Sequence, residues 1–312
     1  MNVIAVTAWR RPEFLKIYLK QLLKNKELPK YSVHFFVDVG YDPEIEDVIN
    51  WFKELHNKVG TTYRSSRISA CPAAYNILHS YIECLYADEF VIIGEEDIIP
   101  SEDFLRFCEY SYRNFLEPYE KIFCIAHKRR QDPQDGNPSY LMGDTQCTSP
   151  FLISKKAIEK YMVGVCSRID FFSNPIAYNQ IYYPNSRIPP HEHYDHDGQI
   201  ERIIEANGLF ALKPDQARTA HIGFYGGTNL PPKMATVDQR VKVIEEICFN
   251  QQKLSEESLI WDKRAVPTEV VTCQLSNYNW EHLYLDVDRV NCKSSSWWYD
   301  PENRFKRYIT GK

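Results

Sequence analysis

Short apolar runs alternate with longer segments of helical period through the first hundred residues, and this alternation limits how the chain can fold more than any other feature. Residues 3–7 and 33–39 are rich in β-branched and aromatic side chains, which predicts strands. A proline follows each run, and apolar residues then recur every three or four positions, which predicts a helix. Repeated β-α units favour a mainly parallel sheet with helices on its faces. The sequence therefore predicts an α/β fold.

The same alternation continues to about residue 212. Residues 90–94 are apolar on both faces, as a central strand of a parallel sheet requires. Polar residues 127–137 predict a loop, and residues 171–190, rich in Asn, Pro and Tyr, predict an irregular segment or lid. The other expected strands are residues 61–63, 122–126, 150–153 and 209–212, and the other expected helices are residues 72–86, 154–161 and 237–253, with two more beginning at Ser101 and near Gly198.

Composition and charge exclude several classes of protein. A net charge of -5 argues against a chain that binds nucleic acid over its whole surface. No run approaches the roughly 18 apolar residues of a membrane span. Residues 1–9 lack the features of a secretory signal, so we expect a cytoplasmic protein. Nine scattered cysteines form no C-x-x-C pair, which indicates reduced, buried side chains rather than a zinc or redox site.

Three consecutive acids, Glu95, Glu96 and Asp97, follow the apolar strand 90–94. Carboxylates at the end of a buried strand are costly unless something neutralises them. The carboxyl ends of strands are also where open α/β sheets bind ligands. Carboxylate oxygens suit a divalent cation that bridges a diphosphate, so the cluster predicts a metal site. The alternative is that the acids only stabilise the start of the helix expected at Ser101.

Taken in order, several segments resemble inverting glycosyltransferases of the GT-A type, above all family 2 and the Golgi N-acetylglucosaminyltransferases that act on mannose. Residues 3–7, Arg11-Pro12 and the helix after them resemble the opening of these enzymes. Residues 87–104 resemble their Glu-Asp-Asp or Asp-x-Asp strand, its loop and the next helix. The resemblance covers about residues 1–225 and implies a GT-A fold, a Rossmann-like, mainly parallel sheet flanked by helices.

The resemblance also implies a domain organisation. Residues 1–230 would form the catalytic domain, with a nucleotide-binding half at 1–126 and an acceptor half at 127–230. Residues 231–312 would form a C-terminal helical or irregular extension. The sequence gives no indication of the oligomeric state.

Most of the donor site follows from the same resemblance. Thr7 and the loop with Arg10 and Arg11 would surround the nucleotide. Asp38, after the second strand, would contact the base or ribose, although it is equally well explained as a strand-end turn residue. Ala74-Tyr75-Asn76 stands where family 2 often has Ala-Arg-Asn, which adds Asn76 to the donor-binding residues.

Within the acidic cluster, Asp97 would be the metal ligand. Glu95 and Glu96 would lie nearer the ribose and the sugar. The sequence has Glu-Glu-Asp where the family pattern has Asp-x-Asp, so the pattern does not directly assign the roles of Glu95 and Glu96.

An inverting transferase needs a carboxylate base for the acceptor hydroxyl. Tyr194-Asp195-His196-Asp197 precedes an amphipathic helix and resembles the family 2 Glu-Asp motif, so Asp195 or Asp197 would be this base, Asp195 being the better match. Either residue is equally suited to cap that helix.

A cluster of three histidines and the single His221 are candidate metal ligands. The spacing of His191, His193 and His196 is not that of a helical zinc site. His221 lies in a loop that resembles the His-containing loop of several GT-A families, where it would bind the metal or a phosphate. It is equally explained as a core histidine bonded to backbone. Glycines 223, 226 and 227 would let backbone approach the diphosphate.

The function expected is transfer of a sugar from a nucleotide-sugar, with UDP the expected nucleotide, to a glycan or small hydroxyl acceptor, with Mn²⁺ or Mg²⁺ as cofactor. One alternative acceptor is a hydroxymethylated pyrimidine in phage-type DNA, which the basic and aromatic tail at residues 297–307 would suit. The basic run 128–130 would face donor phosphates or solvent. A nucleotidyltransferase and a non-catalytic sugar-binding module are further alternatives.

Overall fold

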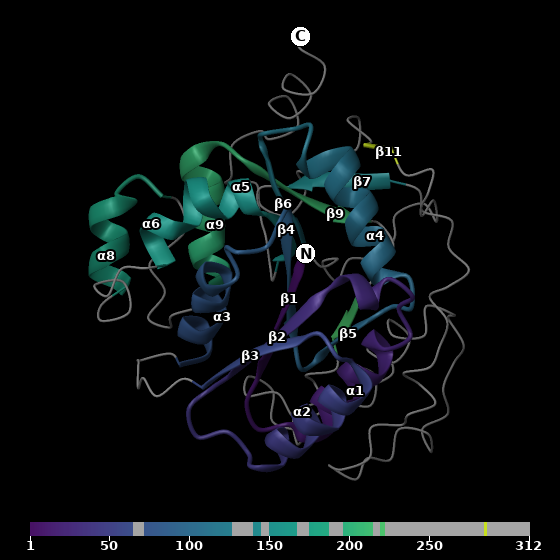
Figure 1. Cartoon of the computed structure of the whole chain (residues 1–312). Coiled ribbons are helices and arrows are strands. Elements are labelled where there is room, and N and C mark those ends of the chain that lie inside the picture. The colour runs from purple at the N-terminus through teal and green to yellow at the C-terminus, as the bar shows by residue number, and fades with distance from the viewer. Residues whose placement is uncertain are drawn as a thin grey trace, which may run out of the picture.

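The computed structural model describes residues 1–64, 72–126, 140–144, 150–166, 175–186, 196–214, 219–221 and 284–285. Within these residues the larger sheet has nine strands in the order β11-β7-β9-β6-β8-β4-β1-β2-β3, and β10 pairs with β5 in a second, two-stranded sheet (Figure 1). Five of the eight neighbouring pairs in the larger sheet are parallel, and β8 runs antiparallel between β4 and β6. The α/β class with a mainly parallel sheet is therefore confirmed.

The strands are β1 Val3–Ala8, β2 Ser32–Val37, β3 Val59–Arg64, β4 Phe90–Glu95, β5 Ile98–Pro100, β6 Ile122–Ala126, β7 Tyr140–Asp144, β8 Pro150–Ser154, β9 Phe210–Pro214, β10 Thr219–His221 and β11 Tyr284–Leu285. The α-helices are α1 Pro12–Leu22, α2 Glu44–Leu55, α3 Pro72–Glu83, α4 Phe104–Ser111, α5 Lys155–Ala157, α6 Val163–Cys166, α8 Pro175–Tyr182 and α9 His196–Asn207. A 3₁₀ turn, η1 Leu28–Lys30, and two π-helical turns, η2 Tyr112–Leu116 and η3 Ile158–Met162, complete the described elements.

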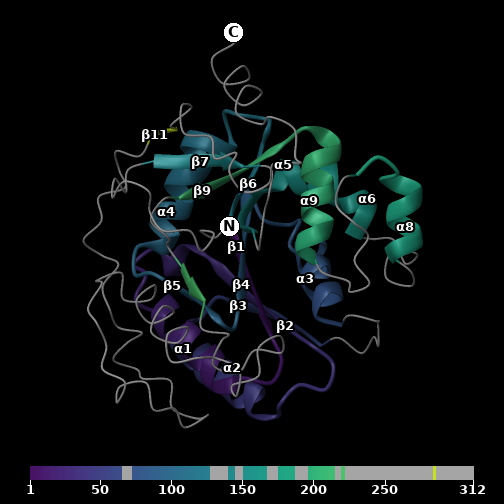
Figure 2. The same cartoon turned by 180° about the vertical axis from the view of Figure 1, so that it is seen from behind.

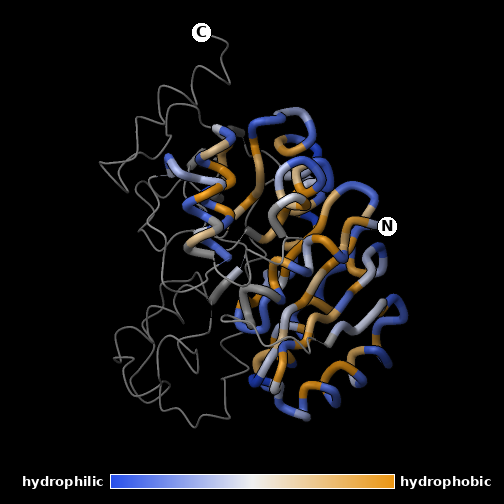
Figure 3. The backbone as a smooth tube through the Cα atoms, turned by 90° about the vertical axis from the view of Figure 1, so that its left-hand side faces the viewer, coloured by the Kyte–Doolittle hydropathy of each residue, from blue (hydrophilic) through white to orange (hydrophobic). Residues whose placement is uncertain are grey.

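Helices cover both faces of the sheet, and the alternation of side chains along β1 shows why. Ile4 and Val6 belong to a core with α1, α2 and α4, whereas Val3 and Ala5 belong to a second core with α3, η3 and α9. The opposite views of Figures 1 and 2 show these two groups of helices on either side of the sheet. Figure 3 shows strands coloured mostly as hydrophobic, while the helices alternate between the two colours. Strands apolar on both faces are what a sheet covered on both sides requires.

Most elements of residues 1–126 agree with the sequence prediction. Helix α1 begins at Pro12, where the missing N–H of proline costs nothing, and buries Phe14 and Leu15. Strand β6 has the predicted bounds. Helix α3 is shorter than predicted, because it ends at Glu83 and not near residue 86. Long periodic segments are therefore read correctly, and errors lie at their ends.

Several short elements were not predicted, among them strands β5, β10 and β7. The segment after Asp97 is strand β5, which pairs antiparallel with β10. The sequence predicts a loop for both of these segments. Because β5 keeps the chain extended to Pro100, the helix expected from Ser101 begins only at Phe104. Strand β7 likewise falls outside every predicted element. Strands of three residues such as β5 and β10 carry too little periodicity to be recognised, and β7 contains Gly143 and Asp144, residue types that are depleted in strands.

The prediction that residues 171–190 are irregular is wrong in part. Residues 175–182 form helix α8, which begins at Pro175, a position where proline is tolerated. Ile181 and Tyr182 are exposed on it, so its apolar residues do not form the single buried stripe that makes a helix recognisable.

Several predictions lie outside the described residues. They concern Asp195, the histidines at 191 and 193, the glycines at 223, 226 and 227, the basic run 128–130, the helix 237–253 and the tail at 297–307. The division at residue 230 stays a prediction. In the described part of the chain, no helix has both the length and the apolar character that crossing a membrane requires.

Candidate donor site at the carboxyl edge of the sheet

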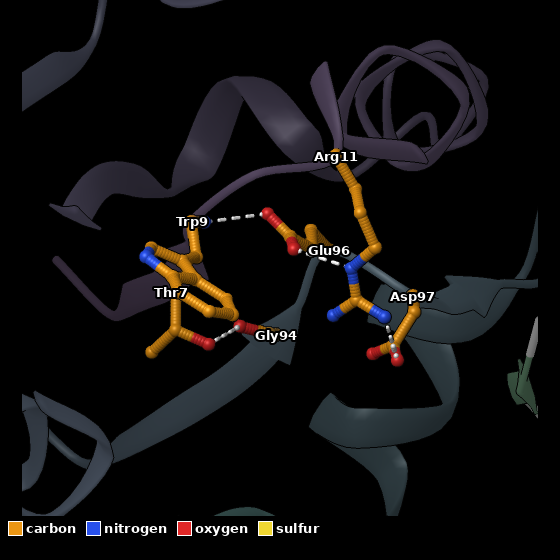
Figure 4. Close-up of polar contacts among 6 residues, drawn as sticks. All are labelled: Thr7, Trp9, Arg11, Gly94, Glu96 and Asp97. Atoms are coloured by element: carbon orange, nitrogen blue, oxygen red, sulfur yellow. Dashed lines mark hydrogen bonds and ion pairs between the residues drawn. The ribbon is translucent and has the colours of Figure 1, made fainter. Parts of the chain in front are cut away.

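The parallel pairing of β1 with β4 brings the end of the first strand beside the acidic cluster. Thr7 lies opposite Glu95 in the register, and the Glu96 backbone N–H donates to the Thr7 carbonyl at 3.2 Å. The Thr7 hydroxyl donates to the Gly94 carbonyl at 3.4 Å (Figure 4). Two segments almost ninety residues apart in sequence therefore form one edge, as the carboxyl ends of neighbouring parallel strands must.

The loop after β1 is tied to the loop after β2. The Trp9 indole N–H donates to the Val39 carbonyl at 2.9 Å, and Arg10 Nε donates to the Gly40 carbonyl at 2.8 Å. Gly40 has a φ of 68°, a conformation that a residue with a Cβ rarely adopts. The Arg10 guanidinium also lies 4.4 Å from the centre of the Trp9 ring. Arg10 is therefore held by the Trp9 ring on one side and by the Gly40 carbonyl of the loop after β2 on the other.

Arg11 joins the first loop to the acids. Its Nε donates to Glu96 Oε1 at 2.6 Å, and its Nη1 donates to Asp97 Oδ2 at 2.8 Å (Figure 4). The other carboxylate oxygen of Glu96, Oε2, accepts the Trp9 backbone N–H at 2.7 Å. Glu96 is 3% exposed and Asp97 is 7% exposed. One guanidinium thus contacts both buried acids, and both oxygens of Glu96 accept hydrogen bonds.

Burial and charge act in opposite directions on these groups. Burial raises the pKa of Glu96 to about 7, although the Arg11 charge and the Trp9 N–H both favour the ionised carboxylate. Burial alone would lower the pKa of Arg11, but the charges of Asp97 and Glu96 outweigh it and hold that pKa above its usual range. Arg11 therefore stays charged at every physiological pH, and Glu96 is the group of this pair that changes charge near neutrality.

Two further predicted donor residues lie on or near β2. Asp38 is buried, and its Oδ1 accepts the Val39 backbone N–H at 2.7 Å, as a turn residue does. Burial raises the pKa of Asp38, and the Val39 N–H opposes this. Asn76, on α3, donates from Nδ2 to the Phe36 carbonyl at 2.7 Å and so ties α3 to β2. These contacts account for the position of each side chain, while their contact with a donor stays a prediction.

Strand β10 brings the backbone of His221 next to the acids. His221 pairs with Ile98, the residue after Asp97, in the antiparallel ladder of β10 and β5. The sequence singles out His221 but offers no sign that it pairs with Ile98, 123 positions before it. The backbone thus joins the two predicted metal residues, Asp97 and His221, at one place.

The predicted base residues are less completely placed. Asp197 lies in the first turn of α9, and its Oδ1 is 3.1 Å from His196 Nε2. Helix α9 begins at His196, two residues before its expected start near Gly198. Its buried stripe of Ile200, Ile203 and Ile204 packs in the same core as α3.

The donor set partly fits a divalent cation. Among the described residues, no three or more His, Cys, Asp or Glu side chains are grouped so that they could hold a metal ion. Mg²⁺ is commonly held by one or two carboxylates together with substrate phosphates, so a complete protein cage is not required. Glu96 is a poor ligand, because both of its oxygens accept hydrogen bonds. Asp97 contacts Arg11 through Oδ2 and stays the predicted ligand.

Sequence reasoning did not find the contact of Arg11 with the acids. It placed Arg11 at the nucleotide and assigned the neutralisation of the cluster to a metal. One signal is present in the sequence, because Arg11 is a cation that follows the first strand of a predicted parallel sheet. The register that decides the contact is a tertiary property.

Comparisons with known proteins match this chain to solved structures. No protein-family model matches the sequence, and no curated protein matches it either. The structure is similar to a crystal structure of S. aureus TarS 1-349, with 13% identity, a TM-score of 0.44, and coverage of 82% of this chain and 67% of that one. It is also similar to the mannosyltransferase PcManGT from Pyrobaculum calidifontis in complex with GDP-Man and Mn²⁺, with 12% identity, a TM-score of 0.46, and coverage of 79% of this chain and 61% of that one.

A further TarS structure contains UDP-GlcNAc and matches with 14% identity and a TM-score of 0.42, over 82% of this chain and 68% of that one. The chain spans 41% of a longer TarS structure. At this degree of similarity the activity has to be argued from the chain's own residues.

Proposed function

We propose that the protein is a glycosyltransferase that uses a nucleotide-sugar, with UDP as the expected nucleotide and Mn²⁺ or Mg²⁺ as cofactor. The observation that carries the proposal is the edge where β1, β4 and β5 meet, with the buried carboxylates of Glu96 and Asp97 beside the loop of residues 9–11. Ligands of open α/β sheets bind at such an edge. The order of the motifs along the chain, set out above, supports the GT-A assignment.

In this proposal the chain's residues have separate duties. A divalent cation at Asp97 would neutralise the diphosphate as the bond to the sugar breaks. Glu96 holds the loop after β1 in place through Trp9 and Arg11. Thr7 and Arg10 would border the nucleotide, and Asp38 would contact its base or ribose. Asp195 or Asp197 would take the proton of the acceptor hydroxyl, which corresponds to inversion at the anomeric carbon.

The first experiment measures release of UDP from a panel of UDP-sugars with Mn²⁺ or Mg²⁺, with and without a chelator. The expected result is release that needs the cation and that is lost in Asp97→Asn, which keeps the shape of the side chain. Glu102→Gln is the matched control, because Glu102 is an acid on the surface whose contact is with Lys24. Full activity in the presence of chelator contradicts the proposed cation.

The product distinguishes this function from a nucleotidyltransferase. Sugar transfer releases a nucleoside diphosphate, whereas nucleotidyl transfer releases pyrophosphate. Release of pyrophosphate from a nucleoside triphosphate would therefore contradict the proposal and indicate a nucleotidyltransferase. The proposed acceptor is a glycan or a small hydroxyl compound. The alternative, a DNA acceptor, rests on residues 297–307, which lie outside the described residues.

A further inference from the structure

The contacts of Arg11 with the two acids differ in kind. Glu96 has two donors, the Trp9 N–H on Oε2 and Arg11 Nε on Oε1, and it is almost completely buried. Asp97 receives Arg11 through Nη1, which belongs to the outer part of the guanidinium. The Arg11 side chain is 22% exposed, so it is the most accessible member of the group. Because the guanidinium is planar and rigid, Arg11 leaves Asp97 only by moving as a unit, and its partial exposure gives it room to do so.

A divalent cation at Asp97 would meet Arg11 directly. Asp97 Oδ2 accepts Arg11 Nη1 at 2.8 Å, and a cation on the same oxygen would lie within a few ångströms of the guanidinium. Two positive groups at that distance in a buried site repel strongly. Binding of the cation must therefore break the contact between Arg11 and Asp97 or be weakened by it.

We propose that Arg11 is an internal competitor for the divalent cation at Asp97, and that its guanidinium leaves Asp97 as the cation binds. This inference rests on the proposed function, since it takes Asp97 as the metal ligand. Arg11 is then a positioning residue with two states, in which the same charge compensates the acids or yields to the cation. In the second state its outer nitrogens are available to donor phosphates, which a guanidinium binds well.

The test measures Mn²⁺ affinity directly, by titration calorimetry or by the electron paramagnetic resonance of free Mn²⁺, without any nucleotide-sugar. Arg11→Met removes the competing charge and keeps the apolar stem. The expected result is a dissociation constant for Mn²⁺ lowered by about tenfold, within the usual range of coupling between two sites. Lys24→Met is the control, because it removes a different cation–acid contact, that with Glu102, and its Mn²⁺ affinity should equal that of the wild type.

Arg11→Met also leaves Glu96 buried without its partner, which can impair folding. The double variant Arg11→Met with Glu96→Gln removes one positive and one negative charge and avoids this cost. It is compared with Glu96→Gln alone. Tighter Mn²⁺ binding by the double variant supports the competition.

The outcomes separate the inference from the function on which it rests. If the wild type and all variants bind Mn²⁺ equally, or the Arg11 variants bind it more weakly, Arg11 is no competitor, and the proposed cation site stands. If only the Arg11 variants bind Mn²⁺, the competition is supported in its strongest form. If no protein binds Mn²⁺ even with UDP present, both the competition and the proposed cation site are wrong.

Discussion

At the scale of single residues, Glu96 stands out because it is a buried acid with a partner for each oxygen. The Trp9 N–H and the Arg11 Nε fix its orientation, and through it they fix the loop after β1. A buried ion pair of this kind is weak evidence for stability, because burying the charges costs about as much as their attraction returns. Its clearer role is to hold the loop after β1 in one conformation.

Glu96 also makes a prediction about pH. Its pKa rises from 4.5 to about 7 on folding, so the folded protein binds this proton more tightly than the unfolded chain does. The stabilisation is complete below the unfolded value and is lost as the pH rises through about 7. We expect wild-type stability to fall by up to about 3 kcal/mol more than that of Glu96→Gln between pH 5 and pH 8.

Urea unfolding of both proteins at a series of pH values measures this difference. Profiles that run parallel over the whole range would show that Glu96 keeps its ordinary pKa.

At the scale of secondary-structure elements, β4 and α1 pack closely together next to the site. A Cβ added to Gly94 would lie 2.2 Å from the hydroxyl oxygen of Tyr18 and 2.7 Å from its ring carbon Cζ. Tyr18 belongs to α1 and is buried, so the ring cannot move aside without displacing its neighbours. The glycine is therefore required by the closeness of the helix.

Gly94→Ala should consequently destabilise the protein by about 1–3 kcal/mol, the usual cost of overpacking a core. The matched control is Gly164→Ala in α6, because a Cβ there meets nothing within 4 Å. That change should stabilise the helix by up to about 1 kcal/mol, since alanine favours helix over glycine. Denaturant unfolding of both variants checks the pair, and equal destabilisation of the two would contradict this account of Gly94.

The cap of α5 is a second prediction at this scale. The Ser154 hydroxyl accepts the Ala157 backbone N–H at 3.1 Å, so it satisfies one of the unpaired donors at the start of the helix. Ser154→Ala should cost about 1 kcal/mol. Ser154→Asp, which also caps, should recover most of the loss. Thermal or urea unfolding measures both, and an unchanged stability in Ser154→Ala would exclude the cap as a significant contribution.

At the scale of the whole molecule, a donor that binds across β1, β2 and β4 should stabilise the folded chain. A ligand that binds only the folded state raises its stability by about 2.7 kcal/mol at a hundred times its dissociation constant. We therefore expect a higher melting temperature with UDP-sugar and Mn²⁺ together than with either alone. A scan of nucleotide-sugars by thermal unfolding also selects among donors.

In this experiment Asp97→Asn should lose the stabilisation that depends on Mn²⁺, while Glu102→Gln should keep it. Stabilisation by UDP-sugar that is identical with and without Mn²⁺ would argue against the cation as part of the donor site.

The sequence alone determined the α/β class and most long elements, because hydrophobic periodicity and proline positions are local properties of the chain. Strand 90–94, helix α1 and strand β6 were found in this way. The position of the acids at a strand end was found for the same reason. Short strands such as β5 and β10 were not found, because their stability comes from pairing between residues far apart.

The tertiary structure decided which groups meet at the site. The register of β1 with β4 puts Arg11 and the Trp9 N–H on Glu96, and no spacing along the chain encodes that contact. The ladder of β5 and β10 likewise brings the His221 backbone to the residue after Asp97. Sequence patterns specify what each segment is, whereas the charge that neutralises a buried acid depends on which segments pack together.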